Sequence, residues 1–422
     1  MSKHVVIVGG GVIGLCSAYY CMQRGLRVTV VERNASQRDG CSFGNAGLIV
    51  PSHFVPLAAP GMVALGLKWM ASPESPFYVR PRCSPDLLSW GFRFWRACTP
   101  QRVERAAPLL RDLHLASRAC YEQLADEWSN DFGLACKGLL MLCRTPQALE
   151  EESHGARRAV ELGMPAEMLD AAATAALDPG VRMQICGSVY YPRDAHLVPQ
   201  RFVAGLQSRL IERGCQFLWQ TEVTDLVRRG RRVALLRTTR GDLSPDEIVL
   251  ASGIWSTGLA RSLRLKLPMQ AGKGYSLTLP EPRQLPQLAA LLTEARVAVT
   301  PMGSSLRFGG TMEMSGLNQS INPARVRGII KSAMEYYPEF RQQDFQGITP
   351  WCGLRPCSPD GLPYLGRTQR YDNVVVATGH AMLGLSLGPI TGQLVARVLT
   401  GEPAGFDLGL LSPDRYAWRL AH

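Results

Sequence analysis

The stretch HVVIVGGGVIGLCSAYYCMQRGLRVTVVER, residues 4–33, decides the fold of this chain. Residues 5–8 are β-branched throughout, which predicts a strand buried on both faces of a parallel sheet. The glycine pattern Gly9-x-Gly11-x-x-Gly14 follows directly. In such a pattern the first glycine permits a tight turn, the second lets the backbone approach a pyrophosphate, and the third lets the helix pack closely on the strand. The stretch therefore predicts a dinucleotide-binding unit.

A helix and a second strand complete this unit. The helix pattern over residues 15–25 stops at Gly25, and the free amides at its start offer an anion site. The strand over residues 27–32 ends in Glu32, where an acid hydrogen-bonds ribose hydroxyls and rejects a 2′-phosphate. This position disfavours NADP and leaves NAD or FAD as the cofactor.

Length and charge bound the remaining possibilities. The chain has 422 residues and 46% hydrophobic content, which predicts two or three globular domains. Its formal net charge is +11, but the basic residues are scattered and no Lys/Arg run with interleaved aromatic residues occurs, so nucleic acid is excluded as a partner. A cationic surface equally suits carboxylate substrates or acidic membrane headgroups.

Cysteine spacing and hydropathy indicate the compartment. The twelve cysteines include no C-x-x-C and no Cys/His spacing of a tetrahedral site, so no metal is predicted and the thiols are expected to be reduced. The apolar run at residues 54–67 is too short to span a bilayer and contains two prolines. We expect a cytoplasmic protein, with peripheral contact at the inner membrane as a further interpretation.

Pieces of the nucleotide fold recur far from the N-terminus. Residues 214–256 supply a strand, a turn, a strand and a hydrophobic strand that ends at Gly253, and residues 373–401 supply a strand, a Gly-rich turn and a helix. Residues 32–61 form a loop rich in Gly, Ser, Pro and Asn, where a nicotinamide dehydrogenase would continue with strand–helix units. This split arrangement favours a flavin enzyme.

The chain resembles the FAD-dependent amino-acid oxidoreductases of the D-amino acid oxidase type, and among them the bacterial D-amino acid dehydrogenases of the small-subunit type. The segments that carry the resemblance are GGGVIGLCSAYY (9–20), CSFGNAGLIVPSHFVPLAAPG (41–61), GKGYSLTL (272–279), LRFGGTMEMSG (306–316), WCGLRPCSPDGLPYLGR (351–367) and ATGHAMLGLSLGPITGQLVA (377–396). The resemblance implies an α/β fold with two domains. One is a Rossmann-like FAD-binding domain split over residues 1–50, 195–265 and 345–422. The other is an α+β substrate domain with a large antiparallel sheet, over residues 51–194 and 266–344.

The resemblance also implies the FAD contacts. The loop around Ser42 would approach the flavin ring, and Val223 would meet the adenine through its backbone. The turn at residues 384–388 would point helix N-terminal amides at the flavin O2 side, which favours the anionic reduced flavin. The full set of predicted FAD-binding residues is Gly9, Gly11, Val12, Ile13, Gly14, Glu32, Arg33, Ser42, Asn45, Ala46, Gly47, Leu48, Val223, Ala251, Gly253, Gly353, Arg355, Gly379, Gly384, Leu385, Ser386 and Leu387.

Oxidation of an amino acid at Cα needs a cation for the carboxylate, a Cα–H that faces flavin N5, and a neutral amine. Arg355 is the candidate clamp, because a guanidinium holds a carboxylate with two parallel hydrogen bonds. Its alternative is a structural pair with an acid such as Asp360. Tyr275 is a second candidate donor to the carboxylate or a packed strand residue, and Lys273 lies over the flavin edge or in solvent.

Histidines give the remaining catalytic candidates. His380 follows the turn at Gly379, and His53 lies in the loop near the expected substrate channel; each is otherwise a structural residue. His196 and the segment GLSLGPITG (384–392) depart from the dehydrogenase pattern near the expected substrate side-chain site. By analogy these departures favour a cyclic imino acid such as cis-4-hydroxy-D-proline or D-proline.

An aromatic and basic segment over residues 67–100 has two interpretations. Its aromatic residues pack a helical subdomain, or they form a membrane or quinone contact together with neighbouring cations. The aromatic residues are Trp69, Trp90, Phe92, Phe94 and Trp95, and the cations are Lys68, Arg93 and Arg96.

These observations favour an FAD-dependent D-amino or cyclic imino acid dehydrogenase. A hydride would pass from Cα to flavin N5, and the electrons would go on to a quinone or another carrier. One alternative is a glycine or sarcosine oxidase that uses oxygen. Another is an FAD-binding subunit of a heteromeric dehydrogenase, and a nicotinamide enzyme is the most distant.

Overall fold

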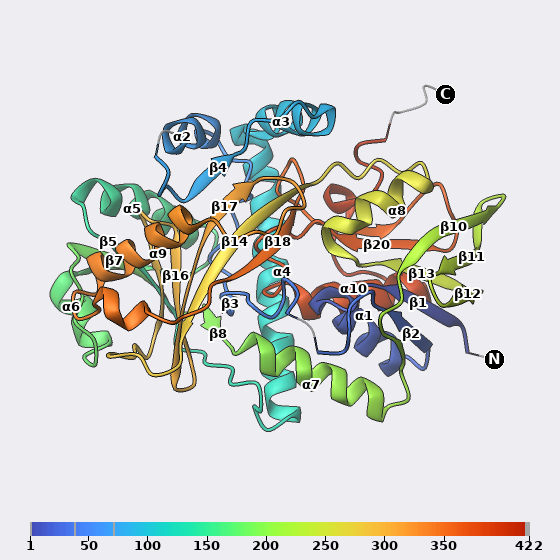
Figure 1. The fold of residues 1–422 in the computed structure, drawn as a ribbon, viewed down its shortest axis with the longest axis horizontal. Helices are drawn as coiled ribbons and strands as arrows, with labels where there is room; N and C mark the ends of the chain where they lie inside the picture. The colour runs from blue at the N-terminus through green and yellow to red at the C-terminus, as the bar shows by residue number, and fades with distance from the viewer. Residues whose placement is uncertain (1, 38, 71, 418–422) are drawn as a thin grey trace.

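The computed structural model describes residues 2–37, 39–70 and 72–417. Residues 1, 38, 71 and 418–422, which belong to the two predicted domains, lie outside the described residues. Two sheets lie side by side, with a long helix between them (Figure 1). The first sheet has six strands in the order β19-β20-β13-β1-β2-β9, parallel except where β19 meets β20. Its strands are β1 (His4–Val8), β2 (Arg27–Val31), β9 (Gln216–Leu218), β13 (Glu247–Leu250), β19 (Tyr364–Arg367) and β20 (Val374–Thr378).

Both faces of this sheet are covered. Val5 and Ile7 of β1 face a core shared with α1 and α10, whereas Val6 and Val8 face a second core shared with α8 and a small three-stranded sheet. The prediction of a strand buried on both faces is therefore confirmed. The covering elements are α1 (Val12–Gln23), α7 (Pro199–Glu212), η1 (Gly253–Trp255), α8 (Ser256–Ser262), α10 (Gly388–Thr400) and η3 (Gly409–Leu411), with β10 (Val223–Arg229), β11 (Arg232–Thr238) and β12 (Gly241–Leu243).

The second sheet has nine strands and is mostly antiparallel. Its order is β18-β14-β17-β16-β15-β5-β7-β6, with β4 paired to β17. Strand β18 joins this sheet although it comes from the sequence block predicted for the FAD-binding domain. The strands are β4 (Phe77–Val79), β5 (Leu139–Cys143), β6 (Glu167–Asp170), β7 (Gly187–Tyr191), β14 (Gln270–Leu279), β15 (Ala289–Leu292), β16 (Val297–Met302), β17 (Ser305–Met314) and β18 (Trp351–Cys357). The predicted fold class is confirmed; the domain boundaries stay a prediction.

A long helix, α4 (Pro100–Glu127), runs between the two sheets and packs on α10 (Figure 1). The short pair β3 (Leu48–Ile49) and β8 (Ala195–His196) also joins distant segments. The other helices are α2 (Met62–Trp69), α3 (Pro85–Ala97), α5 (Pro146–Glu161), α6 (Ala171–Leu177), α9 (Pro323–Tyr336) and η2 (Gln342–Phe345). Among the described residues, no helix has both the length and the apolar character that a membrane crossing requires.

Candidate functional site

A cavity of about 680 Å³ lies at the carboxyl ends of β1, β2, β13 and β20, within the usual size range of ligand pockets. Ligands of open α/β sheets bind at this edge. From the parallel sheet the cavity extends to β18 of the larger sheet. The predicted site residues that line it are Gly9, Gly11, Val12, Ile13, Glu32, Arg33, Ser42, Asn45, Val223, Ala251, Gly253, Arg355, His380, Gly384 and Leu385.

The glycines of the first turn differ in what surrounds them. Gly9 has φ +112°, and a Cβ there would lie 2.6 Å from the Ala251 carbonyl oxygen. A Cβ on Gly14 would lie 1.9 Å from the carbonyl oxygen of Gly9. A Cβ on Gly11 would meet only Ser42 Oγ, at 3.5 Å. Gly9 and Gly14 are thus required by the packing of the protein itself, whereas Gly11 leaves the cavity open to a pyrophosphate, as FAD would require.

Glu32 presents an oriented carboxylate at the end of β2. It is 8% exposed, and its two oxygens accept the Gly10 and Asn34 amides at 2.7 and 2.9 Å. A carboxylate has lone pairs beyond these two bonds, so it can still accept ribose hydroxyls. The Val12 amide donates to Ser42 Oγ at 3.0 Å, which ties the loop after β2 to the start of α1.

Trp255 forms part of the cavity wall and was not predicted. The Arg33 guanidinium carbon lies 3.7 Å from the centroid of its ring, and both residues line the cavity. This cation–π contact puts a guanidinium and an aromatic ring together on the cavity wall. The available signal was an aromatic residue five positions after a strand that ends at the binding edge.

Arg307 anchors the loop around Ser42, which is predicted to contact the flavin, through hydrogen bonds to the loop's backbone. This side chain is 4% exposed, and it donates to the Phe43 and Asn45 carbonyls at 3.2 and 2.7 Å. Burial lowers the pKa of Arg307 to about 10. Asn45 lines the cavity, and its Oδ1 accepts the Gly47 amide at 2.8 Å. The loop is therefore fixed by the larger sheet, since Arg307 lies on β17.

Helix α4 holds the predicted turn at residues 384–388. The Tyr121 hydroxyl donates to the Leu385 carbonyl at 2.6 Å, and His114 Nδ1 lies 2.9 Å from Ser386 Oγ. All these side chains are buried. Leu385 lines the cavity, but Ser386 lies behind it. The turn is thus placed by a helix from a different block of the sequence.

Several predicted residues do not line the cavity. Four of them are glycines required by packing, and Gly14 has been described above. A Cβ on Gly47 would lie 2.4 Å from the Leu197 carbonyl oxygen. A Cβ on Gly353 would lie 2.2 Å from the Trp351 ring, and one on Gly379 would lie 2.8 Å from the Tyr364 ring. The complete set outside the lining is Gly14, Ala46, Gly47, Leu48, Tyr275, His53, Gly353, Gly379, Ser386 and Leu387.

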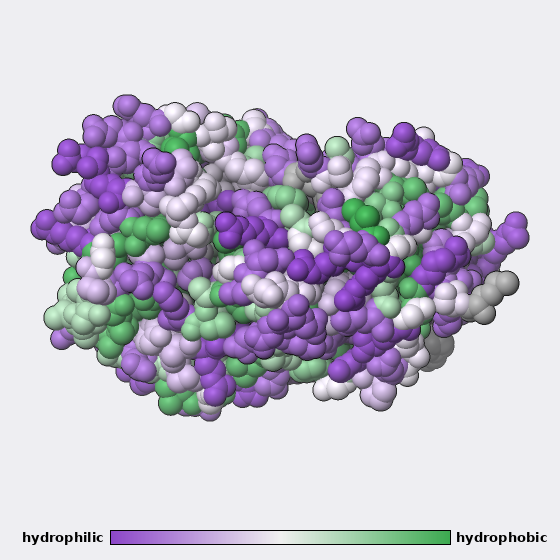
Figure 2. Space-filling model, turned by 90° about the horizontal axis from the view of Figure 1, so that it is seen from below, coloured by the Kyte–Doolittle hydropathy of each residue, from purple (hydrophilic) through white to green (hydrophobic). Residues whose placement is uncertain are grey.

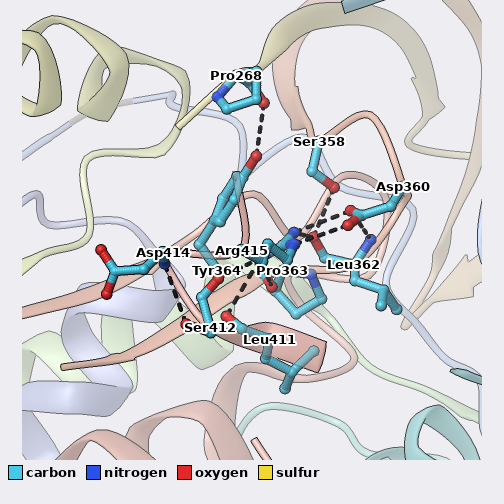
Figure 3. Close-up of polar contacts among 10 residues, drawn as sticks. All are labelled: Pro268, Ser358, Asp360, Leu362, Pro363, Tyr364, Leu411, Ser412, Asp414 and Arg415. Atoms are coloured by element: carbon cyan, nitrogen blue, oxygen red, sulfur yellow. Dashed lines mark hydrogen bonds and ion pairs between the residues drawn. The ribbon is translucent and has the colours of Figure 1, made fainter. Parts of the chain in front are cut away.

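Arg355 reaches the cavity from β18. Its Nη1 donates to the Thr311 carbonyl at 2.6 Å, and burial lowers the pKa of its guanidinium. Asp360 forms its ion pair with Arg415 instead, through contacts of 2.8 and 3.0 Å (Figure 3). Within the described chain, no ion pair joins Arg355 to a carboxylate. The guanidinium therefore retains donors for an anionic ligand.

Tyr275 and Lys273 are engaged elsewhere. The Tyr275 hydroxyl donates to Glu313 Oε2 at 2.8 Å, and Lys273 Nζ lies 3.1 Å from Glu313 Oε1 and donates to the Ser320 carbonyl at 2.8 Å. Burial and the neighbouring Glu313 raise the pKa of Tyr275. For Glu313, burial opposes ionisation, but donors that include Tyr275 and Lys273 outweigh it and lower the pKa. Neither Tyr275 nor Lys273 lines the cavity.

The two histidine candidates differ in position. His380 lines the cavity, its Nε2 lies 3.0 Å from Thr391 Oγ1, and burial lowers its pKa to about 3. It is therefore neutral at physiological pH. His53 lies outside the lining, with Nδ1 3.0 Å from Ser52 Oγ, whose hydroxyl donates to Asp194 at 2.5 Å. His196 is buried in the β3–β8 pair.

Comparison with known proteins gives matches over nearly the whole chain. The family described as "FAD dependent oxidoreductase" (DAO) matches residues 4–398. D-amino acid dehydrogenase from Paramagnetospirillum magneticum is 33% identical over 98% of both chains, and that from Methylobacterium radiotolerans is 34% identical over 98% of this chain and all of its own. Among solved structures, glycine oxidase from Geobacillus kaustophilus superposes with a TM-score of 0.78 at 25% identity, covering 98% of this chain and 99% of its own.

Proposed function

The chain belongs to the DAO family of FAD-dependent oxidoreductases, and from this premise we propose that it dehydrogenates D-amino or cyclic imino acids at Cα. The position of Arg355 supports an amino or imino acid substrate. Its guanidinium lines the cavity and has no carboxylate partner in the described chain. The full-length relatives named D-amino acid dehydrogenase support the same substrate class.

Bound FAD supplies the electron acceptor for oxidation at Cα. The chain's own residues bind and orient. Gly11 and the start of α1 receive the pyrophosphate, Glu32 the ribose, and Arg355 the substrate carboxylate. A two-point contact at the carboxylate fixes the direction of the Cα–H bond. Neutral His380 adds no positive charge to the cavity wall. In the described lining the guanidinium groups are Arg33, which stacks on Trp255, and Arg355, which comes from β18 of the larger sheet.

The finer substrate proposal is a cyclic imino acid such as cis-4-hydroxy-D-proline or D-proline. It is supported by the departures at His196 and in the segment GLSLGPITG (384–392) from the pattern of D-amino acid dehydrogenases. The competing function is a glycine or sarcosine oxidase, which the structural similarity to glycine oxidase keeps as the second candidate. The two functions differ in their electron acceptor.

The anaerobic flavin spectrum of the purified protein tests this proposal. The test compounds are a panel of D- and L-amino acids that includes D-proline, cis-4-hydroxy-D-proline, glycine and sarcosine, and each is added in excess under argon. We expect bleaching by a D-compound and slow recolouring when air is admitted. Bleaching by glycine or sarcosine with rapid recolouring and peroxide release would instead indicate the oxidase. A yellow protein that none of these compounds bleaches would contradict both functions.

The proposed route for the electrons is a quinone in a membrane that the protein contacts through α3. Leu88, Phe92 and Trp95 are spaced four and three residues apart, so they share one helix face, and they are 71%, 58% and 60% exposed. Trp90 and Phe94 stack on each other, in agreement with the packing interpretation for these two residues.

Positive charge accompanies this apolar face. Arg96 lies on the last turn of α3, and Lys68 and the exposed Leu67 lie on α2; within the described residues no ion pair joins Lys68 or Arg96 to a carboxylate. Both helices lie along the top edge of Figure 1. The opposite face is mostly hydrophilic, with hydrophobic residues in small separate groups (Figure 2). An apolar stripe with cations beside it suits an anionic lipid surface.

A further inference from the structure

Strand β17 contains a β-bulge at Thr311. Lys273 of β14 pairs with Glu313, but Tyr275 pairs with Gly310, so Gly274 faces two residues of β17. Thr311, one of these two, has φ +74°. This left-handed region is unfavourable for a β-branched residue and costs on the order of 1–3 kcal/mol. Such strain persists only where the surrounding structure holds it, and bulges often redirect groups next to active sites.

The bulge turns a carbonyl toward Arg355. The Thr311 carbonyl oxygen accepts from Arg355 Nη1 at 2.6 Å. On the neighbouring strand, a Cβ on Gly274 would lie 2.3 Å from both Nη1 and Nη2 of the same guanidinium. Gly272 pairs with Arg355, and Gly274 pairs with Gly353. The guanidinium therefore lies directly against the β14 backbone at a position that only glycine leaves open.

We propose that the Thr311 bulge and Gly274 together position the Arg355 guanidinium for its carboxylate ligand. The Thr311 carbonyl engages one N–H, and the bare backbone at Gly274 lets the planar group lie where its remaining donors face the cavity. A bidentate clamp requires this orientation, because both donors must meet the two carboxylate oxygens at once. The inference rests on the proposed role of Arg355.

The bulge has a second consequence, and the test must distinguish it from the positioning of Arg355. It brings Glu313 opposite Lys273, and these two residues with Tyr275 form a buried polar cluster. If the bulge served only this cluster, changes at Thr311 or Gly274 would alter stability without altering carboxylate binding. A binding measurement with a simple carboxylate therefore distinguishes a positioning role from a structural one.

The experiment uses Gly274→Ala in the FAD-loaded protein and follows the flavin absorbance change on titration with propionate, with propionamide as the uncharged control. The new methyl group must displace the guanidinium, so we expect the propionate dissociation constant to rise at least tenfold, with retained FAD and unchanged propionamide binding. Gly309→Ala is the matched control, because its Cβ would meet nothing closer than 3.6 Å. Propionate binding by Gly274→Ala equal to that of the Gly309→Ala control would overturn the proposal.

Further variants at Arg355 and Thr311 test the coupling and the bulge. In an Arg355→Lys background, Gly274→Ala should change propionate affinity less than twofold, since the guanidinium is gone; a full tenfold additional loss would overturn the proposal. If Arg355→Lys binds propionate as tightly as the parent protein, the proposed role of Arg355 is overturned instead.

The variants at Thr311 test the bulge. Thr311→Gly should raise the melting temperature but weaken propionate binding about threefold, because a glycine no longer fixes the direction of the carbonyl. Thr311→Val should leave the melting temperature and propionate binding unchanged. If Thr311→Gly binds propionate as tightly as the parent protein, the bulge does not help to position Arg355, and that part of the proposal is overturned.

Discussion

At the scale of single residues, the same glycine pattern contains two kinds of position. Gly9 and Gly14 face protein backbone, and Gly11 faces the cavity. The motif alone gives all three a cofactor role, but only the surroundings show which glycine the fold needs and which the ligand needs. Arg355 and Arg415 present a similar case, because only the structure shows which of them pairs with Asp360.

The glycine difference predicts opposite outcomes for two alanine variants. Gly14→Ala places a Cβ against the Gly9 carbonyl and should lower the free energy of unfolding by about 2 kcal/mol or more, with or without FAD. Gly11→Ala should stay within about 1 kcal/mol of the parent without FAD but bind FAD at least tenfold more weakly. Urea unfolding of the apoprotein and FAD titration measure these effects. Equal stability loss in the two variants would contradict this assignment.

At the scale of elements, α3 shows how periodicity predicts a helix but not its partner. The spacing of Leu88, Phe92 and Trp95 is that of a helix face packed against a core, yet this face is exposed. The buried residues of α3 are Trp90 and Ala97, and the Trp90 indole N–H donates to the Cys357 carbonyl at 2.9 Å. Which face of an amphipathic helix is covered depends on the neighbouring elements.

The exposed face of α3 predicts binding to anionic vesicles. The parent protein should sediment with vesicles that contain phosphatidylglycerol and not with pure phosphatidylcholine, and added salt should weaken the binding. The Phe92→Ser/Trp95→Ser variant should bind at least tenfold more weakly while keeping its activity with an artificial dye. Ile211→Ser is the control, since Ile211 is 52% exposed on α7 at a different surface. Equal vesicle binding by both variants would contradict a contact through α3.

At the scale of the whole molecule, the interior contains titratable groups that must stay neutral. Burial lowers the pKa of His114 and His380 to about 3 and that of His53 and His196 to about 4. Burial raises the pKa of Asp194 to about 7, against hydrogen bonds from Ser52. These groups gather where the two sheets, α4 and the β3–β8 pair meet, so their energetic cost belongs to the assembled fold.

These pKa shifts predict acid sensitivity. Below pH 6.5 the unfolded chain binds protons on the four histidines and the folded protein does not, so stability falls as pH drops from 6.5 toward 4. Asp194 acts in the opposite direction, because between pH 3.8 and 7 only the folded protein keeps its proton. For these five groups, four protons against one give a net slope of about 4 kcal/mol per pH unit.

Urea unfolding of the FAD-saturated protein between pH 5 and 7.5 measures this slope. His196→Gln should reduce the slope by about 1.4 kcal/mol per pH unit, because one buried histidine is gone and the unfolded chain then binds one proton fewer. A stability that does not change over this range in the parent protein would contradict the prediction.

The sequence by itself determined the nucleotide unit, the fold class and the cofactor class. Strand, glycine turn, helix, strand and Glu32 follow one another within residues 4–33, so local pattern suffices to predict them. The cavity position of Arg355 could also be predicted through the resemblance of its segment. The engagement of Tyr275 and Lys273 with Glu313 could not, nor could the part played by Trp255.

Only the tertiary structure decided which side chains remain free to act. Thr311 meets Arg355 across 44 residues, Tyr275 meets Glu313 across 38, and Asp360 meets Arg415 across 55. A hydrogen bond or ion pair is set by the angle and distance between two groups, and strand register and bulges fix these quantities. No local pattern encodes them, because they depend on how distant strands and turns pack together.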